Sequence, residues 1–236
     1  MTPSPARVLV FASGKGGTSK TTLSLALADV WAEKGARVAL VDADPQAGLT
    51  TAAGCEPPVS PLEAEPVLVH GFTLYRSGRA LAGASVADHL ARIRAAADAA
   101  EVVLVDCSPA LTDAGHVAAL ELASLVVVCA RTDAAGLRNV EETVQLATAA
   151  GVPAVVVPTF RTGTGLSREA EGFLRGRYGN RVTGATFPND ARAAEAAGSG
   201  KPVTRTAKRS KAADAVRAIG AELAENLNFS QPLAAP

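Results

Sequence analysis

The sequence predicts an α/β protein with a doubly wound, mostly parallel sheet flanked by helices. Short apolar runs suited to buried strands alternate with stretches whose apolar residues recur at helical spacing. The first apolar run is followed by a glycine-rich turn that opens a helix, as in phosphate-binding loops. The 236 residues are 48% hydrophobic but only 4% aromatic, and they contain no internal repeat. We therefore expect a single domain over residues 1–236, with flexible ends at 1–7 and 229–236.

The first expected unit is a buried strand followed by an amphipathic helix. Residues 8–12 are all apolar, which is typical of a parallel strand covered on both faces. From Leu23 onward, apolar side chains recur at i, i+4, i+7 and i+8, and Lys34-Gly35 is a typical helix end. A second strand is predicted at 38–41, and it leads into the acidic segment 42–46.

The middle of the chain holds one long loop before the alternation resumes. Residues 54–66 contain four prolines and three glutamates, which indicates a surface loop. A short strand is predicted at 72–75 and an alanine-rich helix at 80–99. Residues 102–105 are apolar and lead directly into Asp106, which predicts a buried strand at 102–106 with an acid at its end.

The C-terminal half continues the same alternation, which favours a parallel sheet built from βαβ units. Further strands are predicted at 125–130 and 153–158. Helices are predicted at 137–147, 165–178, 190–197 and 212–227.

The turn between the first strand and helix is a candidate phosphate-binding loop. Glycines let successive backbone N–H groups converge on phosphate oxygens, and the helix N-terminus adds partial positive charge. Lys20 would place its ammonium on the outer phosphates, and the Thr21 hydroxyl would bind Mg²⁺. A glycine-rich turn with solvated lysines is the simpler alternative. The candidate nucleotide-binding residues are Gly14, Lys15, Gly16, Gly17, Thr18, Ser19, Lys20, Thr21 and Thr22.

Acidic residues follow two of the predicted strands. Asp42 and Asp44 come after the second strand, and Asp106 ends the strand at 102–106. In open α/β sheets, ligands bind at the carboxyl ends of the strands, so these side chains are candidates for one site. Turn formation is the alternative for Asp42 and Asp44, because an Asp before a Pro, as in Asp44-Pro45, readily starts a turn. The phosphate loop upstream makes a shared site the favoured interpretation.

The loop carries an additional lysine, Lys15, and Ser19 occupies the second glycine position of the common pattern G-x-x-x-x-G-K-[ST]. The arrangement Lys15-Gly-Gly-x-x-Lys-Thr resembles the deviant Walker A motif of the ParA/MinD group of P-loop ATPases. Segment 42–46 is similar to that family's switch segment, and 102–106 is similar to its Walker B strand. Stretches at 166–169 and 200–203 are also similar. The resemblance covers most of the chain and is closest to the short ParA-type partitioning ATPases.

The resemblance implies a role for each site residue, with ATP and Mg²⁺ as cofactors. Lys15 would be the signature lysine that reaches the partner's phosphates across an ATP-bound homodimer, while Lys20 holds the phosphates of its own subunit. Asp44 would orient the attacking water, so Lys15, Lys20 and Asp44 form the catalytic set. Such a set suits phosphoryl transfer, which depends on positioning and charge neutralisation. The implied metal-binding residues are Thr21, Asp42 and Asp106.

The sequence departs from the family pattern after the Walker B strand. Asp106 is followed by Cys-Ser-Pro-Ala, where the family more often has a sequence like Thr-Pro-Pro. The segment 107–110 therefore matches the family pattern less closely than the phosphate loop does.

Three functions compete within the resemblance: a ParA-type DNA-segregation ATPase, a MinD-like membrane-bound ATPase, and a non-hydrolysing scaffold or metal-cluster carrier. A membrane helix needs cations for anionic lipid, but residues 221–236 contain no Lys or Arg. The cysteines Cys55, Cys107 and Cys129 are widely spaced and form no C-x-x-C, which argues against a metal cluster. The ParA-type function, in which the dimer holds DNA without sequence preference, is therefore favoured.

A basic region near the C-terminus is the candidate DNA-binding surface. Residues 161–217 contain twelve basic and five acidic residues, although the whole chain has no net charge. The densest basic cluster, at 205–211, lacks aromatic residues, so it suits phosphate contact rather than base stacking. A solvated charged surface is the alternative. The candidate DNA-binding residues are Arg192, Arg205, Lys208, Arg209 and Lys211.

Partners and location follow from the resemblance and from the absence of targeting signals. The N-terminus lacks the apolar stretch of a signal peptide, and no apolar run approaches 18 residues. We therefore expect a cytoplasmic, nucleoid-associated protein that does not bind membranes. The chain begins close to its first strand, as in short ParA forms that do not read an operator themselves. The resemblance then implies a ParB-like centromere-binding adaptor as partner.

Overall fold

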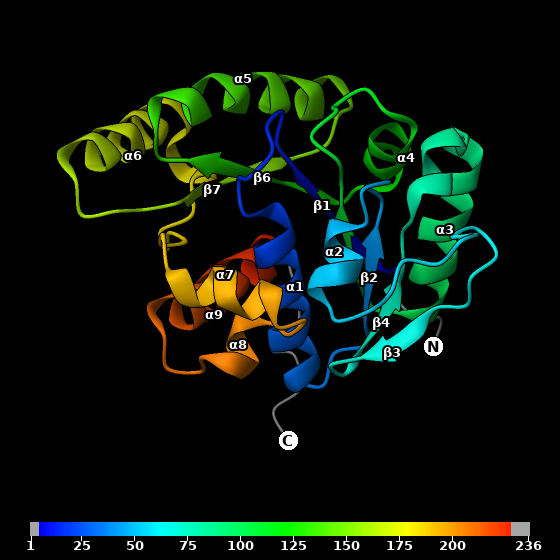
Figure 1. The fold of residues 1–236 in the computed structure, drawn as a ribbon. Coiled ribbons are helices and arrows are strands. Elements are labelled where there is room, and N and C mark those ends of the chain that lie inside the picture. Colours follow the sequence, from blue (N-terminus) through cyan, green and yellow to red (C-terminus); the bar gives the residue numbers. More distant parts are fainter. Residues whose placement is uncertain (1–4, 228–236) are drawn as a thin grey trace.

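A computed structural model describes residues 5–227 as a seven-stranded sheet between two layers of helices (Figure 1). The strand order is β3-β4-β2-β5-β1-β6-β7, and only the β3–β4 pair is antiparallel. The predicted doubly wound, mostly parallel sheet is thus confirmed. Most of the predicted flexible ends, residues 1–4 and 229–236, lie outside the described part of the chain. The strands are β1 (Arg7–Ala12), β2 (Val38–Asp42), β3 (Val67–Val69), β4 (Phe72–Tyr75), β5 (Val102–Asp106), β6 (Leu125–Arg131) and β7 (Ala154–Thr159).

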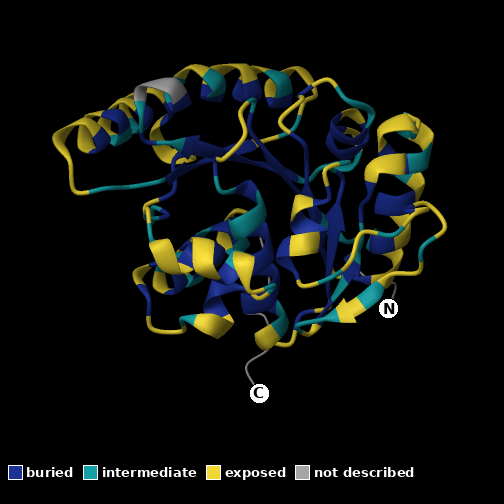
Figure 2. Cartoon of the chain, viewed as in Figure 1, coloured by how far each residue is buried: buried dark blue, intermediate teal, exposed yellow. Residues whose placement is uncertain are grey.

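Helices cover both faces of this sheet. Helices α1, α2, α7, α8 and α9 pack on one face, and α3, α4, α5 and α6 pack on the other (Figure 1). The central strands are buried, whereas the edge strand β3 and the outer faces of the helices are partly or fully exposed (Figure 2). The helices are α1 (Lys20–Glu33), α2 (Gly48–Ala52), α3 (Val86–Ala99), α4 (Ala114–Leu122), α5 (Ala134–Ala149), α6 (Gly165–Tyr178), α7 (Ala191–Gly198), α8 (Val203–Thr206) and α9 (Lys211–Asn226).

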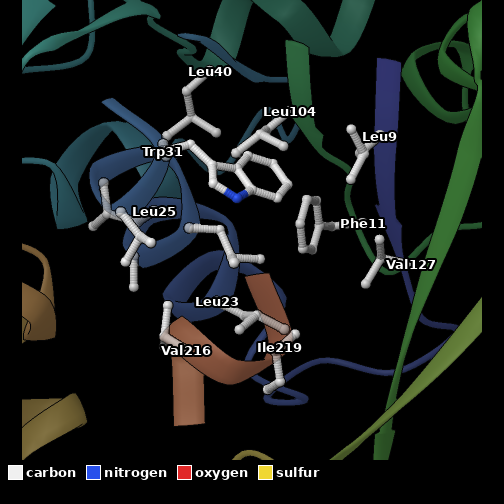
Figure 3. Close-up of a cluster of buried hydrophobic side chains, with 14 of the residues drawn as sticks. Leu9, Phe11, Leu23, Leu25, Trp31, Leu40, Leu104, Val127, Val216 and Ile219 are labelled. Atoms are coloured by element: carbon white, nitrogen blue, oxygen red, sulfur yellow. The ribbon is translucent and has the colours of Figure 1, made fainter. Parts of the chain in front are cut away.

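The larger core lies between the sheet and the layer formed by α1 and α9. Alternation along β1 sends Leu9 and Phe11 into this core, whereas Val8 and Val10 face α3 and α4. Trp31 of α1 is fully buried and lies among Phe11, Leu40 and Leu104 (Figure 3). Burial of these large side chains anchors α1, and with it the loop that precedes α1.

Close packing of α9 on α1 requires a glycine. A Cβ at Gly220 would lie 2.9 Å from Leu27 Cδ2 and 3.4 Å from Trp31 Nε1. The absence of a side chain at this position lets the two helices approach, although glycine in a helix interior costs about 1 kcal/mol relative to alanine.

Sequence patterns located the strands well but missed short elements. The helix predicted at 80–99 was wrong in its first part: a 3-10 turn covers Arg79–Gly83, and α3 begins only after Ser85. Ser85 and Asp88 form a capping box there, which satisfies two backbone N–H groups and sets the helix start. Helices α2, α4 and α8 and strand β3 were not predicted, because segments of three to nine residues carry little periodicity.

Candidate nucleotide-binding site

The predicted phosphate loop connects β1 to α1 at the carboxyl edge of the sheet. Two of its residues adopt left-handed backbone conformations, Gly17 with φ 70° and Ser19 with φ 68°. The Ser19 side chain makes no capping hydrogen bond to α1. Glycine tolerates this conformation, whereas a serine carries a strain of about 1 kcal/mol there. Ser19 therefore adopts a backbone conformation that favours glycine, at a local cost in stability.

The two lysines of the loop occupy different environments. Lys20 is buried, with 6% of its surface exposed, and its Nζ lies 3.5 Å from the carbonyl oxygen of Lys15. The side chain of Lys20 thus folds back over the loop that it follows. Lys15 is exposed to solvent. Lys20 can therefore serve the loop's own ligand, while Lys15 is free to reach a group outside the chain.

Thr21 and Asp106 meet where α1 begins beside β5. The Thr21 hydroxyl donates to Asp106 Oδ2 at 2.7 Å. The other oxygen, Oδ1, is buried without a hydrogen-bond partner among the described residues. An unpaired buried carboxylate oxygen is costly, and a hydroxyl beside it completes an oxygen pair of the kind that Mg²⁺ prefers. These two residues therefore fit the predicted metal role.

Metal binding by a cage of side chains alone is not indicated. No group of three His, Cys, Asp or Glu residues within 5–227 is arranged to hold a metal ion. Mg²⁺ commonly keeps several waters and binds through one or two protein oxygens plus phosphates. The Thr21–Asp106 pair agrees with that mode.

Asp42 differs from Asp106 because both of its carboxylate oxygens accept hydrogen bonds from the protein. Its Oδ2 accepts from both the backbone N–H and the hydroxyl of Thr50, at 2.8 and 2.7 Å, and its Oδ1 accepts from the Asp44 N–H at 3.2 Å. These contacts hold segment 42–50 and the start of α2. Metal ligation by Asp42 stays a prediction, and the observed role of its carboxylate is to anchor this segment.

The two buried acids are adjacent across the β2–β5 pair, where Asp42 is the register partner of Asp106. Burial, reinforced by the charge of Asp106, raises the pKa of Asp42 to about 7. Burial also raises the pKa of Asp106 to about 6, although the Thr21 hydrogen bond and Lys20 oppose the shift. Two carboxylates in this position favour a positive charge between them and the phosphate loop.

Asp44 lies at the edge of the site and is half-buried. Its Oδ1 accepts from the Gln46 N–H at 2.9 Å, and its carbonyl oxygen accepts from the Ser77 hydroxyl at 2.7 Å. Ser77 also donates its N–H to the Thr50 hydroxyl at 2.8 Å. The backbone around Asp44 is thus held from two sides, while its other carboxylate oxygen is available to orient a ligand.

Two residues that contact the loop were not identified from the sequence. Arg131 Nη1 donates to the carbonyl oxygen of Gly17 at 3.0 Å, and Thr159 Oγ1 donates to that of Thr18 at 3.1 Å. They end β6 and β7. The rule that selected Asp42 and Asp106, a polar residue at the carboxyl end of a parallel strand, would have found both.

The segment after β5 follows its own hydrogen-bond pattern. The Ser108 hydroxyl donates to the carboxylate of Asp113, which caps the N-terminus of α4. The Ala110 N–H donates to Ser108 Oγ at 3.0 Å. Ser108 therefore forms a compact turn at the position where the family more often has proline. Cys107 is buried, and burial raises the pKa of its thiol well above the ordinary range, so it acts as a small apolar residue.

Basic residues surround a shallow depression beside α8. Its volume is about 510 Å³, and Arg192, Arg205, Lys208 and Arg209 contribute to its lining. Lys211 is exposed at the start of α9. The depression therefore brings together Arg192 of α7, Arg205 of α8 and two cations of the loop that follows α8. These residues lie on the helical layer that includes α1.

Arg205 differs from the other cations of this surface because it is bound into the fold. Its Nε donates to the carboxylate of Asp29, which is 0% exposed, and its Nη2 donates to the His70 carbonyl oxygen. The Thr204 hydroxyl donates to the second oxygen of Asp29. Arg205 thus links α8 to α1 and to the β3–β4 turn. We assign Arg205 to the fold and leave the remaining four cations as the candidate DNA-binding residues.

Replacing Asp106 should stabilise the ligand-free protein. Because the folded-state pKa of Asp106 is raised from 3.8 to about 6, the contribution of Asp106 to wild-type stability falls as the pH rises through that interval and is level above it. Asp106→Asn removes this cost and should be roughly 2 kcal/mol more stable than the wild type at about pH 8. At about pH 4 the difference should nearly vanish. Urea unfolding at both pH values measures the difference in stability, with the exposed-site variant Asp98→Asn as control. An Asp106→Asn variant that is less stable than the wild type at about pH 8 would contradict the proposed cost of burying the Asp106 charge.

Removing Arg205 should cost more than removing a neighbouring cation. Of the side-chain partners that the described residues provide, Arg205→Ala leaves the buried Asp29 carboxylate with the Thr204 hydroxyl alone. It should lower the free energy of unfolding by about 2 kcal/mol, allowing for partial exposure of the arginine. Lys208→Ala should change it by less than about 0.5 kcal/mol. Urea denaturation of the two variants tests this difference. An equal loss of unfolding free energy in the two variants would show that the Asp29–Arg205 pair does not stabilise the fold.

Comparisons with known proteins agree with this geometry. Residues 9–203 match the family described as the CobQ/CobB/MinD/ParA nucleotide binding domain. The chromosome-partitioning ATPase Soj of Thermus thermophilus is 32% identical, with 92% of this chain and 95% of that protein covered. The chromosome partitioning protein ParA of Caulobacter vibrioides is 29% identical, with 86% and 88% covered.

Solved structures show the same fold. Cobyrinic acid a,c-diamide synthase from Mycobacterium smegmatis, with bound ATP analog and magnesium, has a TM-score of 0.79 at 26% identity and covers 96% of this chain and 97% of its own. The Pyrococcus furiosus cell division ATPase MinD has a TM-score of 0.81 at 20% identity, and the match covers 94% of this chain and 99% of the MinD chain. The ligands of the first structure are those expected from the resemblance. Within residues 5–227, no helix has the length and apolar character needed to cross a membrane.

The family match spans the phosphate loop, the switch segment and the β5 aspartate, and the fold and the Thr21–Asp106 geometry agree with it. The chain therefore belongs to the CobQ/CobB/MinD/ParA family of nucleotide-binding domains, as its deviant Walker A motif predicted.

Proposed function

We propose that this protein is a ParA-type ATPase that dimerises on ATP, holds DNA without sequence preference and releases it on hydrolysis. The observation that carries the ATPase part is the buried Asp106 oxygen, beside the Thr21 hydroxyl, that has no hydrogen-bond partner within residues 5–227, with Lys20 folded over the same loop. Similarity to Soj and ParA over most of the chain supports the partitioning role. The cargo would be a chromosome, a plasmid or another assembly.

Each residue of the site then has a step in ATP hydrolysis. Thr21 and Asp106 would hold Mg²⁺, which neutralises charge on the phosphates when bound. The loop N–H groups and Lys20 bind and orient the phosphate chain. Asp44 positions the attacking water at the edge of the site. Lys15, exposed on the outer side of the loop, neutralises charge on the partner subunit's nucleotide, so hydrolysis requires two subunits.

The basic surface around α8 is proposed to bind the phosphates of duplex DNA. Arg192, Lys208, Arg209 and Lys211 are exposed cations with no aromatic residue among them. Such contacts are independent of sequence and weak for one subunit, and pairing two subunits raises the affinity through avidity. We further propose that the protein acts with a ParB-like adaptor in the cytoplasm, at the nucleoid.

A second candidate function is ATP-dependent amide synthesis. It is favoured by the structural likeness to a protein described as cobyrinic acid a,c-diamide synthase. The two functions differ in what stimulates ATP turnover: duplex DNA and an adaptor for the first, a carboxylate substrate with an amine donor for the second. Stimulation by DNA alone supports partitioning.

Lys20 and Asp44 should affect ATP hydrolysis in different ways. Lys20→Ala removes charge from the outer phosphates and should weaken ATP binding by at least about tenfold, together with turnover. Asp44→Ala leaves the loop intact and should retain ATP binding while turnover falls by about a hundredfold. Equilibrium binding and phosphate release distinguish the two. Turnover by Asp44→Ala near the wild-type rate would remove Asp44 from the catalytic set.

Dimerisation should require both ATP and Lys15. Lys15→Ala should bind nucleotide within about threefold of the wild type but remain monomeric, because its ammonium is needed only across the subunit interface. Light scattering with ATP under non-hydrolysing conditions gives the mass, and Lys34→Ala, at the far end of α1, is the matched control. A dimer that forms without ATP and is unaffected by Lys15→Ala would refute the sandwich arrangement.

DNA binding should depend on the exposed cations near α8. The double variant Lys208→Ala/Arg209→Ala should lower affinity for all duplex sequences alike and reduce the salt dependence by about two units of slope per subunit. The control Arg37→Ala/Arg94→Ala removes two cations from weak surface ion pairs elsewhere. Fluorescence anisotropy with random duplexes and ATP measures the affinity and its salt dependence for both double variants. If ATP-loaded wild type shows no salt-sensitive DNA binding, the partitioning role is wrong even where ATP hydrolysis is intact.

A further inference from the structure

Arg131, the last residue of β6, contacts the phosphate loop from outside the family motif. Its Nη1 donates to the Gly17 carbonyl oxygen at 3.0 Å, and its Nε donates to Asp133 Oδ2 at 2.7 Å. The guanidinium carbon lies 4.0 Å from the centre of the Phe160 ring. These three contacts fix the side chain, of which 28% is exposed. None of the roles proposed above uses it.

Thr159 makes a matching contact from the neighbouring strand. It is the register partner of Arg131 in the β6–β7 pair. Its side chain is fully buried, and Oγ1 donates to the Thr18 carbonyl oxygen at 3.1 Å. Two consecutive carbonyl groups of the loop are thus held by one cross-strand pair. This arrangement needs the ends of β6 and β7 to be level, which their register provides.

Fixing these carbonyl groups also orients the loop's N–H groups. In a planar trans peptide, the C=O and the following N–H point in opposite directions. With the Gly17 and Thr18 oxygens turned toward β6 and β7, the N–H groups of Thr18 and Ser19 are directed to the opposite side of their peptide planes. Gly17 and Ser19 are in left-handed conformations, so no regular secondary structure holds these peptides. Their orientation depends on the side chains that hold them.

Arg131 is itself well supported. Asp133, its ion-pair partner, caps α5 by accepting from the Gly136 N–H at 2.8 Å. A Cβ at Gly136 would lie 2.5 Å from the Arg131 carbonyl oxygen, so the corner between β6 and α5 is closely packed. Phe160, which lies under the guanidinium, follows Thr159 directly and has a left-handed φ of 56°. The arginine therefore connects the loop to a rigid corner.

We propose that Arg131 is a positioning residue for nucleotide phosphates. It holds the Gly17 peptide so that the N–H of Thr18 faces the bound phosphate chain, and Thr159 does the same for the next peptide. This inference rests on the proposed function, because the ligand is the phosphate chain of the nucleotide. Preorganised N–H groups bind a phosphate without the cost of ordering the loop at the moment of binding.

Arginine is specifically required for this role. A guanidinium can donate two hydrogen bonds in fixed directions while stacking its plane on an aromatic ring. An ammonium at the same position has the charge but neither the planar fork nor the stacking face. Arg131→Lys should therefore behave like Arg131→Ala rather than like the wild type.

The test is the affinity of each variant for MgADP, measured by titration calorimetry on the full chain. Arg131→Ala and Arg131→Lys should each weaken binding by about tenfold, and the isosteric variant Thr159→Val by about threefold. Arg138→Ala, an exposed arginine on α5, should stay within twofold of the wild type. Guanidinium ion at low, non-denaturing concentration should restore part of the affinity of Arg131→Ala but not of Arg131→Lys. A purely structural arginine would give no such rescue.

The possible results separate this inference from the proposed function. Failure of the wild type to bind MgADP would overturn the proposed function. Wild-type binding together with folded Arg131→Ala and Arg131→Lys variants of unchanged affinity would overturn the role of Arg131 alone. If Arg131→Ala does not fold, Arg131→Lys and Thr159→Val decide, and normal MgADP affinity in both would refute the inference.

Discussion

The site depends on the parallel pairing of β1 with β5. This pairing places Phe11 opposite Asp106, so the strand that leads into the phosphate loop ends beside the strand that supplies the carboxylate. The 2.7 Å hydrogen bond from Thr21 then joins the two segments. A register slip of one residue would turn Asp106 to the other face of the sheet, away from Thr21. The burial of Leu9, Phe11 and Trp31 maintains this register, and thus the core holds the site together.

The two buried carboxylates show how adjacent acids acquire different roles. Asp42 and Asp106 are register partners, and burial raises the pKa of both. Thr50 and the Asp44 N–H satisfy Asp42, which makes it the anchor of the switch segment. Asp106 keeps one buried oxygen without a partner among the described residues. The protein thus carries a destabilising feature at the position where the proposed metal would relieve it.

In the basic region, too, neighbouring residues of the same charge have different roles. Arg205 and Lys208 are three positions apart, yet one is paired with a fully buried aspartate and the other is exposed beside a shallow depression. The ion pair joins α8 to α1, the helix that follows the phosphate loop. The proposed DNA-binding surface and the nucleotide loop are therefore attached to the same helix. A substitution at Arg205 would disturb the fold as well as the surface charge.

The sequence by itself determined every strand except β3, the phosphate loop with both lysines, and the acids at the ends of β2 and β5. These signals are local: apolar runs, a glycine-rich turn and helical spacing can each be identified within about a dozen residues. Only the tertiary structure decided which acid keeps a free oxygen, that Arg205 pairs with Asp29, and that Arg131 and Thr159 hold the loop. Those pairings join residues 114 to 176 positions apart in the chain. Their partners are selected by strand order, register and packing, and no local pattern encodes them.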